Sequence, residues 1–398
     1  MKILYITPYV PSLIRVRPYN LIKCLARQGH RVTVLSLQSA EQEEKDAGEL
    51  RSYCHHVETV RLPRQQSLLN CLRALPTMTP LQAAYCHSSA MQRRIDRVLQ
   101  EEQFDIVHIE HLRGAHFGTP VAGVPKVYDA VDCISLLFEK TLHSAPNLAS
   151  RLMAWLDLGR TRRYESQLIS HYDKVLVTSA QDKEALLALD GRVQEKKITV
   201  LPNGVDLEYF TFANGHREPE TLVFSGKMSY HANVAAASHL LQEVMPLIWA
   251  RRPGVKLEIV GHNPPQAIRA LARDGRVRVT GSVPDLRPYL ARATVAVSPM
   301  PYSVGIQNKV LEAMATGTPV VASSQACSAL TVSDGTHLLV ADDPTAFAEQ
   351  VLHLLDDAAL RQAIAMNARN YVEEKHDWRT IAHNLENVYA EVMDQWQS

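Results

Sequence analysis

Short runs of consecutive apolar residues alternate along the chain with longer segments in which apolar residues recur every three to four positions. The first run, KILYIT at 2–7, is followed by such a segment, RPYNLIKCLARQGH at 17–30, and then by the run RVTVLSL at 31–37. A buried strand, an amphipathic helix and a second buried strand in this order predict a β-α-β unit with parallel strands.

The same alternation continues almost to the end of the chain. Predicted strands of a first set lie at 57–62, 105–110, 126–131, 174–179 and 198–202, and those of a second set, after the polar stretch 213–220, at 221–226, 255–261, 277–283, 293–299, 319–323 and 337–341. This pattern predicts an α/β protein with two Rossmann-like, doubly wound domains facing each other across a cleft. We expect an N-terminal domain at 1–200, a C-terminal domain at 201–375, and an amphipathic helix at 376–398 that packs back on the N-terminal domain.

Composition narrows the class of protein without naming a ligand. The 398 residues are 46% hydrophobic and 21% charged, with no net charge, which is typical of a globular protein and gives no reason to expect a nucleic-acid partner. The six cysteines show no spacing of a metal site or disulfide framework, so we expect reduced thiols and a cytoplasmic protein. No apolar run approaches the length of a membrane-spanning helix, which limits the expected membrane contact to a peripheral one at the inner face.

One stretch, SPMPYSVGIQNKVLEAMATGTPVVAS at 298–323, predicts a strand end, a turn, a helix, a glycine stop and another strand. The backbone N–H groups of a helix start have no partner within the helix and lie at its positive end, so a turn led by Gly305 suits a phosphate group. Lys309 adds a full positive charge there. An ordinary crossover, with Lys309 and Glu312 on a solvated face, explains the same residues when the stretch is taken alone.

Several stretches together resemble the family 4 glycosyltransferases, which have the GT-B fold. They are LPNGVDLEYF, FSGKMSYHANV, LEIVGHNP, VRVTGSVPDLRPYLARATVAVSP and GIQNKVLEAMATGTPVVAS, in the order and spacing of that family. Within it, the chain is most similar to bacterial sugar transferases of exopolysaccharide synthesis, through its Tyr-x-x-Asn and GIQNK segments. The resemblance implies a retaining, metal-independent hexosyltransferase that needs no cofactor beyond a nucleotide-sugar donor, with UDP favoured over GDP. The implied acceptor is a hydroxyl of a saccharide, lipid-linked or small molecule.

The resemblance also assigns roles within the C-terminal domain. The donor diphosphate is expected on the helix start, at Gly305, Ile306, Gln307, Asn308 and Lys309, and the base at the backbone of Gly281, Ser282 and Val283. Glu312, about two turns beyond Gly305, is expected to accept hydrogen bonds from the ribose hydroxyls. Lys227 and Lys309 are expected to neutralise the leaving diphosphate. The family usually has a glutamate where this chain has Val304, so contacts to the donor sugar are expected to differ.

In the N-terminal domain, polar residues at predicted strand ends are the candidates. His111 lies where family members often hold a histidine near the donor sugar, whereas His108 is expected to be buried structure. Arg17, at the start of the first helix, opposes the helix dipole and therefore suggests a phosphate partner. Asp129 and Asp132, at the next predicted strand end, are candidates either to orient an acceptor hydroxyl or to cap the following helix, and capping is favoured for Asp132.

Three further interpretations remain open from the sequence. The arginines around Trp155, from Arg151 to Arg163, fit a solvated helix face or a membrane-facing patch. A non-catalytic partner protein that binds a nucleotide sugar fits the valine at position 304, and a sugar-nucleotide 2-epimerase has a similar two-domain fold. For the enzyme itself no nucleophile is evident, and we expect front-face attack in which the leaving phosphate takes the acceptor proton.

Overall fold

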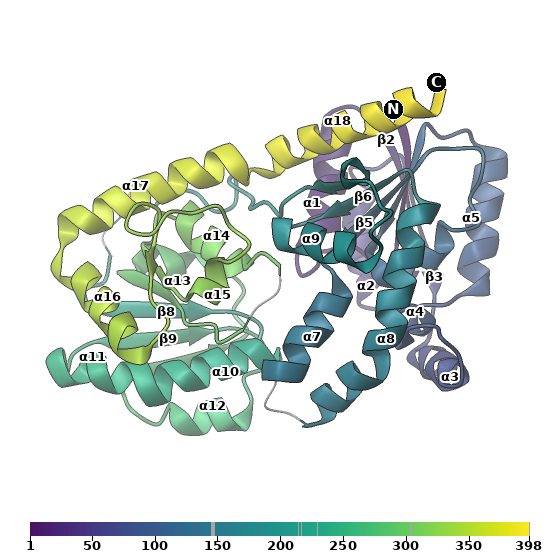
Figure 1. The fold of residues 1–398 in the computed structure, drawn as a ribbon. Helices are drawn as coiled ribbons and strands as arrows, with labels where there is room; N and C mark the ends of the chain where they lie inside the picture. The colour runs from purple at the N-terminus through teal and green to yellow at the C-terminus, as the bar shows by residue number, and fades with distance from the viewer. Residues whose placement is uncertain (145–147, 214, 216, 229, 303–304, 398) are drawn as a thin grey trace. The chain divides into compact units, whose positions relative to one another are not determined.

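The computed structural model describes residues 1–398 apart from 145–147, 214, 216, 229, 303–304 and 398 (Figure 1). Within this range the chain divides into two compact units. Unit 1 consists of Met1–Pro202 and Trp378–Ser398, and unit 2 of Asn203–Asp377. Each unit is a parallel sheet with helices on its two faces, which confirms the predicted fold class of two Rossmann-like domains.

Unit 1 is built on a seven-stranded parallel sheet in the order β3-β2-β1-β4-β5-β6-β7. The strands are β1 Lys2–Thr7, β2 Arg31–Gln38, β3 His56–Arg61, β4 Ile106–Glu110, β5 Lys126–Val131, β6 Lys174–Val177 and β7 Ile198–Val200. Strand order reverses between β1 and β4, whose carboxyl ends therefore border the crevice where ligands of such sheets bind. The loop of Pro8–Arg15 follows β1, and His111 follows β4.

The helices of unit 1 fill the crossovers between these strands. They are α1 Val16–Arg27, α2 Glu43–Leu50, α3 Arg64–Ala74, α4 Leu81–Tyr85, α5 Ser89–Glu101, α6 His111–Gly114, α7 Ile134–Ser144, α8 Leu148–His171 and α9 Ala180–Leu189. The last helix of the chain, α18 Trp378–Gln397, also belongs to unit 1 and packs against α1. Its stripe of Trp378, Ile381 and Leu385 is fully or almost fully buried, because these residues lie on one face of the helix.

Unit 2 repeats the architecture with six parallel strands in the order β10-β9-β8-β11-β12-β13. The strands are β8 Thr221–Ser225, β9 Lys256–Val260, β10 Val277–Gly281, β11 Val295–Ser298, β12 Val320–Ala322 and β13 Leu339–Val340. The helices are α10 His231–His239, α11 Met245–Arg251, α12 Gln266–Leu271, α13 Arg287–Arg292, α14 Asn308–Ala315, α15 Ser324–Cys327, α16 Pro344–Asp356 and α17 Ala358–Lys375. The strand order reverses between β8 and β11, so the ligand crevice is expected at the carboxyl ends of these two strands.

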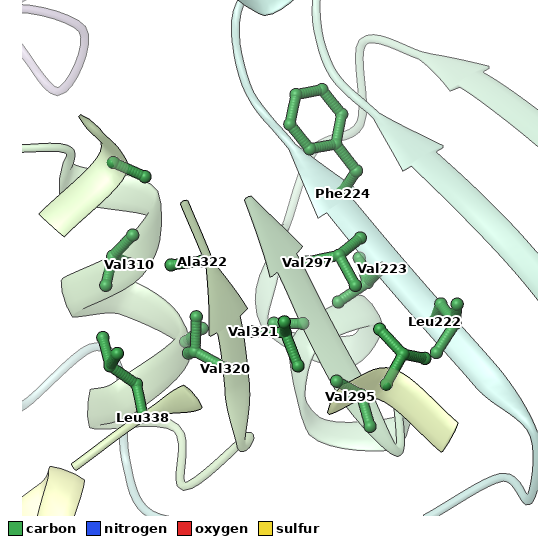
Figure 2. Packing of buried hydrophobic residues seen from close by; sticks show 14 of the residues in the cluster. Leu222, Val223, Phe224, Val295, Val297, Val310, Val320, Val321, Ala322 and Leu338 are labelled. Atoms are coloured by element: carbon green, nitrogen blue, oxygen red, sulfur yellow. The ribbon is translucent and has the colours of Figure 1, made fainter. Parts of the chain in front are cut away.

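The core of unit 2 holds α14 in place beneath this crevice. Figure 2 shows apolar side chains of β8, β11 and β12 packed together, with Val310 of α14 beside β12 and Phe224 at the carboxyl end of β8. In α14, Val310, Leu311 and Met314 are at most 1% exposed. One face of this eight-residue helix is therefore anchored by burial, which fixes its first turn at the end of β11.

Candidate functional site

Three loops meet at the carboxyl edge of the unit 2 sheet and are bonded to one another through their backbones. The N–H of Gly226 donates to the carbonyl of Val260 at 3.0 Å, and the N–H of Gly261 donates to that of Gly281 at 3.2 Å. A Cβ atom on Gly261 would lie 1.7 Å from the carbonyl oxygen of Gly226, so only glycine allows this approach. The edge thus presents packed backbone instead of bulky side chains, which leaves room for a ligand.

The first turn of α14 lies beside these loops, with the positive end of the helix at this edge. Gly305, in the turn before the helix, has a φ of 65°, a conformation that favours glycine. The first turn contains no acidic residue, and the side chain of Gln307 at the cap position makes no capping hydrogen bond. Backbone N–H groups of an uncapped first turn attract anions. Val304, where the resemblance led us to expect a glutamate, lies outside the described residues.

Lys309 points from this turn toward the end of β8, where its partners are neutral. Its Nζ donates to Oδ1 of Asn233, lies 3.4 Å from Sδ of Met300, and sits 4.8 Å from the centroid of the Phe224 ring. Burial lowers the pKa of Lys309 to about 7, and the nearby carboxylate of Glu312 opposes this shift. Among the described residues no anion is bonded directly to the ammonium group, and a diphosphate would supply one.

Glu312 lies on the same helix, three residues beyond Lys309. Burial raises the pKa of its carboxyl to about 7, and the charge of Lys309 only partly offsets this effect. Among the described residues, no hydrogen bond reaches its carboxylate, so its oxygens keep their capacity to accept. A half-buried carboxylate with this capacity suits the two vicinal hydroxyls of a ribose.

Asn233 is a site residue to which sequence reasoning gave no role. Its Nδ2 donates to the carbonyl oxygen of Lys227 at 3.0 Å, while its Oδ1 accepts from Lys309. The amide thus joins the turn after β8 to the first turn of α14. The signal was present in the segment Tyr230-x-x-Asn233, but the sequence alone did not reveal that its partner is Lys309. The side chain of Lys227 itself is exposed at this edge.

The segment predicted to face the base lies at the end of β10. Gly281 is buried with a φ of 74°, and its carbonyl is taken by Gly261. Oγ of Ser282 lies 2.5 Å from Nδ1 of His262, which follows β9. Val283 is half-buried and packs against the core of unit 2. The structure therefore brings the predicted residues 281–283, 305–309, Lys227 and Glu312 to one edge of unit 2.

His111 and Arg17 belong to unit 1, which is described by itself. His111 begins α6 with a φ of 64°, which is unusual for a residue other than glycine and occurs often at functional sites. Its Nδ1 accepts from the backbone N–H of Arg113 at 3.2 Å. Burial, assisted by the charge of Arg113, lowers the pKa of His111 to about 3, so the ring is neutral at pH 7. Its catalytic role stays a prediction.

Arg17 was predicted at a phosphate, and in the structure its guanidinium binds a carboxylate of the same unit. Nε donates to Oδ2 of Asp129 at 2.8 Å, and Nη1 donates to the carbonyl of Pro202 at 3.2 Å. The side chains of Arg17 and Asp129 are 4% and 0% exposed. The charge that opposes the helix dipole is thus balanced within the protein, and a phosphate contact of Arg17 stays a prediction.

The neighbouring strand ends hold a network of buried polar side chains. Tyr5 and Tyr9 each donate a hydrogen bond of 3.0 Å to the carboxyl of Glu110. Burial and the charge of Asp129 raise the pKa of Glu110 to about 8. His108 is fully buried and stacks on Tyr5, which confirms that it is structural.

The predicted capping role of Asp132 is wrong. Helix α7 begins at Ile134, and its first N–H groups donate to Glu165, which comes from α8: Ile134 at 2.7 Å and Ser135 at 3.1 Å. Asp132 instead accepts from the hydroxyl of Thr178 at 3.2 Å. Glu165, which is distant in sequence, therefore caps α7 in place of Asp132, which the local spacing had predicted.

The described residues offer no evident metal site and no membrane-spanning helix. In the part of the chain that the structure describes, no three His, Cys, Asp or Glu side chains gather as a set that could hold a metal ion. No helix in that part is both long and apolar enough to cross a membrane.

Comparisons with known proteins agree with this geometry. A sequence model described as Glycosyltransferase Family 4 matches residues 15–209, and one described as Glycosyl transferases group 1 matches residues 219–357. A glycogen synthase of Mycobacterium tuberculosis is 30% identical over 302 residues, covering 72% of this chain and 68% of that protein. A phosphatidyl-myo-inositol mannosyltransferase of Mycolicibacterium smegmatis is 26% identical over 315 residues, covering 76% and 75%.

Solved structures show the same fold at low sequence identity. Sucrose-phosphate synthase from Thermosynechococcus elongatus aligns with a TM-score of 0.72 at 17% identity, covering 99% of this chain and 100% of that one. Anabaena HepE in complex with UDP aligns with a TM-score of 0.70 at 15% identity, covering 98% and 100%. Matching sequence models in both units, a relative at 30% identity and the shared two-sheet architecture place the chain in one family: it belongs to the family 4 glycosyltransferases and has the GT-B fold.

Proposed function

We propose that this glycosyltransferase moves a hexosyl group from a nucleoside-diphosphate sugar to a hydroxyl of a saccharide, lipid-linked or small-molecule acceptor, with retention of anomeric configuration. The observation that carries the proposal is the arrangement at the start of α14. There a helix start without a side-chain cap from Gln307, a lysine whose described partners are neutral, and a carboxylate with accepting capacity lie within five residues of one another. A diphosphate followed by a ribose supplies what each of these groups lacks.

The chemistry follows from where charge develops. As the anomeric C–O bond of the donor breaks, the electron pair stays on the leaving diphosphate, which Lys227, Lys309 and the N–H groups of the turn stabilise. The acceptor oxygen forms the new bond on the same face of the sugar, and its proton goes to the leaving phosphate oxygen. Since these cations neutralise the leaving group, the proposed reaction needs no metal ion. Asn233 holds Lys309 and the Lys227 backbone together, which fixes the cationic side of the site.

The nucleotide is proposed to be UDP, with GDP as the competing donor. Anabaena HepE was crystallised with UDP, whereas one relative from Corynebacterium glutamicum, 30% identical over 208 residues, is named as a GDP-mannose-dependent mannosyltransferase. In this chain the predicted base segment offers backbone groups and the Ser282–His262 pair. The proposed role in polysaccharide or glycoconjugate synthesis rests on the resemblance of the GIQNK segment to that of exopolysaccharide transferases.

A non-catalytic partner that only binds nucleotide sugar is the second candidate, favoured by valine at position 304. Such a protein would keep Glu312 and the helix turn but would not break the donor bond. Incubation with the donor, followed by analysis of released nucleoside diphosphate and of the sugar product, separates binding from turnover. Without acceptor, a changed sugar configuration would reveal an epimerase instead.

A thermal-shift panel tests the donor site. UDP, GDP, their glucose and mannose conjugates, and AMP as a control are added without metal to the parent protein and to Glu312→Ala, Lys227→Ala and Glu349→Ala. A ligand that binds the folded state raises the unfolding temperature, and the rise grows with the ratio of ligand concentration to its dissociation constant. We expect stabilisation by a uridine or guanosine diphosphate that is lost in the first two variants and kept in Glu349→Ala, an exposed control. Equal stabilisation of all variants would contradict the proposed site.

A further inference from the structure

Unit 1 carries an unusual concentration of exposed apolar side chains. Among the described residues, ten of the eighteen large hydrophobic side chains that are exposed lie in two short segments. These ten define the α3–α8 surface: Leu68, Leu69, Leu72, Leu75, Met78, Leu148, Leu152, Met153, Trp155 and Leu156. Single exposed hydrophobic residues are normal on soluble proteins, whereas a group of this size indicates an interaction site.

The apolar residues of α8 lie on its solvent-facing side. Leu148, Leu152 and Trp155 are 78%, 57% and 67% exposed, and their spacing of four and three residues places them on one face of the helix. The opposite face is buried at Ala154 and Asp157. The other side of α8 thus already packs against unit 1. The exposed apolar stripe is not needed for this packing.

Helix α3 has the same arrangement. Leu68 and Leu72 are 59% and 62% exposed, while Ser67 and Ala74 are buried on the other side. The end of α3 is tied to α8, because Nη2 of Arg160 donates to the carbonyl of Leu75 at 2.6 Å. Figure 1 shows α3 and α8 in the same part of unit 1. Two helices of one unit therefore expose leucine-rich faces near one another.

The charged side chains that accompany these two helices are mostly positive, with Glu139 of α7, which is paired with Arg162, as an exposed acid. The sequence has no Asp or Glu between Glu58 and Asp96, nor between Glu139 and Asp157, and Asp157 is buried. Exposed arginines accompany both helices, and the following have no ion pair among the described residues: Arg64, Arg73, Arg151 and Arg163. A leucine-rich face with one tryptophan and a rim of arginines matches the interface of a bilayer that contains anionic lipids.

Both helices leave the same edge of the sheet. Helix α3 follows β3, and α7 with α8 follows β5, so both segments emerge at the carboxyl ends of parallel strands. The loop after β1 adds two further exposed side chains at that edge, Leu13 at 67% and Ile14 at 82%. This is also the edge that holds His111. A bilayer contacted by these segments would lie on the side of unit 1 where ligands of such sheets bind.

We propose that the α3–α8 surface docks unit 1 on an anionic lipid bilayer, with the leucines and Trp155 inserted at the headgroup level and the arginines against lipid phosphates. The excess of exposed arginines over acids decides in favour of this partner over a second copy of the chain, since two such surfaces would bring like charges together. The proposal stands independently of the donor and the reaction.

The test is co-sedimentation with vesicles of phosphatidylcholine alone and of phosphatidylcholine with about one third phosphatidylglycerol. The parent protein is compared with Leu152→Ser/Trp155→Ser, with Arg151→Glu/Arg163→Glu, and with the matched control Leu247→Ser/Leu271→Ser from exposed positions of unit 2. We expect binding to the anionic vesicles only, at least tenfold weaker in the first two variants and unchanged in the control. Thermal unfolding and response to UDP or GDP should be the same in all four proteins, because every substituted side chain is exposed.

Two readouts make the result decisive. The fluorescence of Trp155 should shift to the blue when anionic vesicles are added, and this shift should be absent in the variant that lacks it. Equal sedimentation of all variants, or none with either vesicle, would overturn the proposal. So would a concentration-dependent dimer of the parent protein that the serine variant abolishes, because the surface would then be an interface between copies. If no donor binds while vesicle binding follows the expected order, the proposed function is contradicted and the docking surface is supported.

Discussion

The carboxyl edges of the two sheets differ in whether their buried charged residues have ion partners within the protein. In unit 1, Arg17 and Asp129 are paired with each other in the interior, and Glu110 is held by two tyrosines. In the described part of unit 2, Lys309 has only neutral groups at bonding distance, and Glu312 accepts no hydrogen bond. The same architecture thus gives Arg17 an ion partner inside unit 1, whereas in the described part of unit 2 no anion is bonded to Lys309.

This difference separates structural charges from charges that await a ligand. A buried ion pair becomes very costly when one partner is removed, because the other charge stays in the interior without compensation. A charge that has no internal ion partner bonded to it can be removed with a smaller loss of stability. Its removal should instead lower the affinity for the ligand. Stability and ligand affinity should therefore respond in opposite ways in the two units.

The largest expected effect is on stability in unit 1. Arg17→Ala leaves the carboxylate of Asp129 buried without its partner and should lower the free energy of unfolding by about 3–5 kcal/mol. Denaturant unfolding followed by circular dichroism measures this change. Arg251→Ala, which removes the exposed partner of Glu349, is the control and should be nearly neutral. Equal stability of Arg17→Ala and the parent would show that the pair is not structural.

The second effect concerns the glycine contact in unit 2. Gly261→Ala places a Cβ atom against the carbonyl of Gly226, which is backbone and has to shift. We expect a loss of about 1–3 kcal/mol of stability together with weaker donor binding. Gly275→Ala is the matched control, because a Cβ atom there meets nothing within 4 Å. Unchanged donor affinity in Gly261→Ala would mean that the loops after β8 and β9 do not shape the site.

The third effect is a pH dependence with a defined sign. Because the folded state raises the pKa of Glu312 to about 7, from an ordinary value of 4.5, this group costs stability as pH rises from about 4.5 to 7. Glu312→Gln removes that cost and should be more stable than the parent at pH 8, by about 1–2 kcal/mol. The two proteins should converge near pH 4.5. A parent protein that is the more stable one at pH 8 would contradict the incomplete pairing of Glu312.

The smallest effect tests the cap of α7. Glu165→Ala removes the acceptor for two N–H groups and should cost about 1 kcal/mol, whereas Asp132→Ala should stay within about 0.5 kcal/mol. Denaturant unfolding of both variants in parallel measures the difference. The reverse order would restore the cap predicted from the sequence.

Local pattern was enough to predict the two sheets, because buried parallel strands are continuously apolar and the segments between them have helical spacing. It was also enough to bring Gly305, Lys309 and Glu312 together, since all three lie within one turn and the helix that follows it. These features depend on neighbours along the chain.

Contacts between residues that are distant in sequence could not be predicted from this local pattern. Arg17 finds Asp129, α7 is capped by Glu165, and Lys309 is held by Asn233. In each case local spacing carries no information about the contact, because the contact depends on which strands and helices become neighbours in the fold. The exposed face of α3 was not predicted either, since leucines at helical spacing predict a buried stripe as readily as a docking surface. For α8, the sequence left a membrane-facing patch around Trp155 as one of two interpretations.

The central claim is that Lys309 at the start of α14 receives its anion from the donor. Calorimetric titration with UDP and GDP at pH 8, in buffers of different ionisation enthalpy, counts the protons taken up on binding. Since burial lowers the pKa of Lys309 to about 7, the lysine is mostly neutral at pH 8 and should gain a proton beside a diphosphate. We predict uptake approaching one proton by the parent protein and none by Lys309→Met. Binding without proton uptake, or the same uptake by both proteins, would contradict the account.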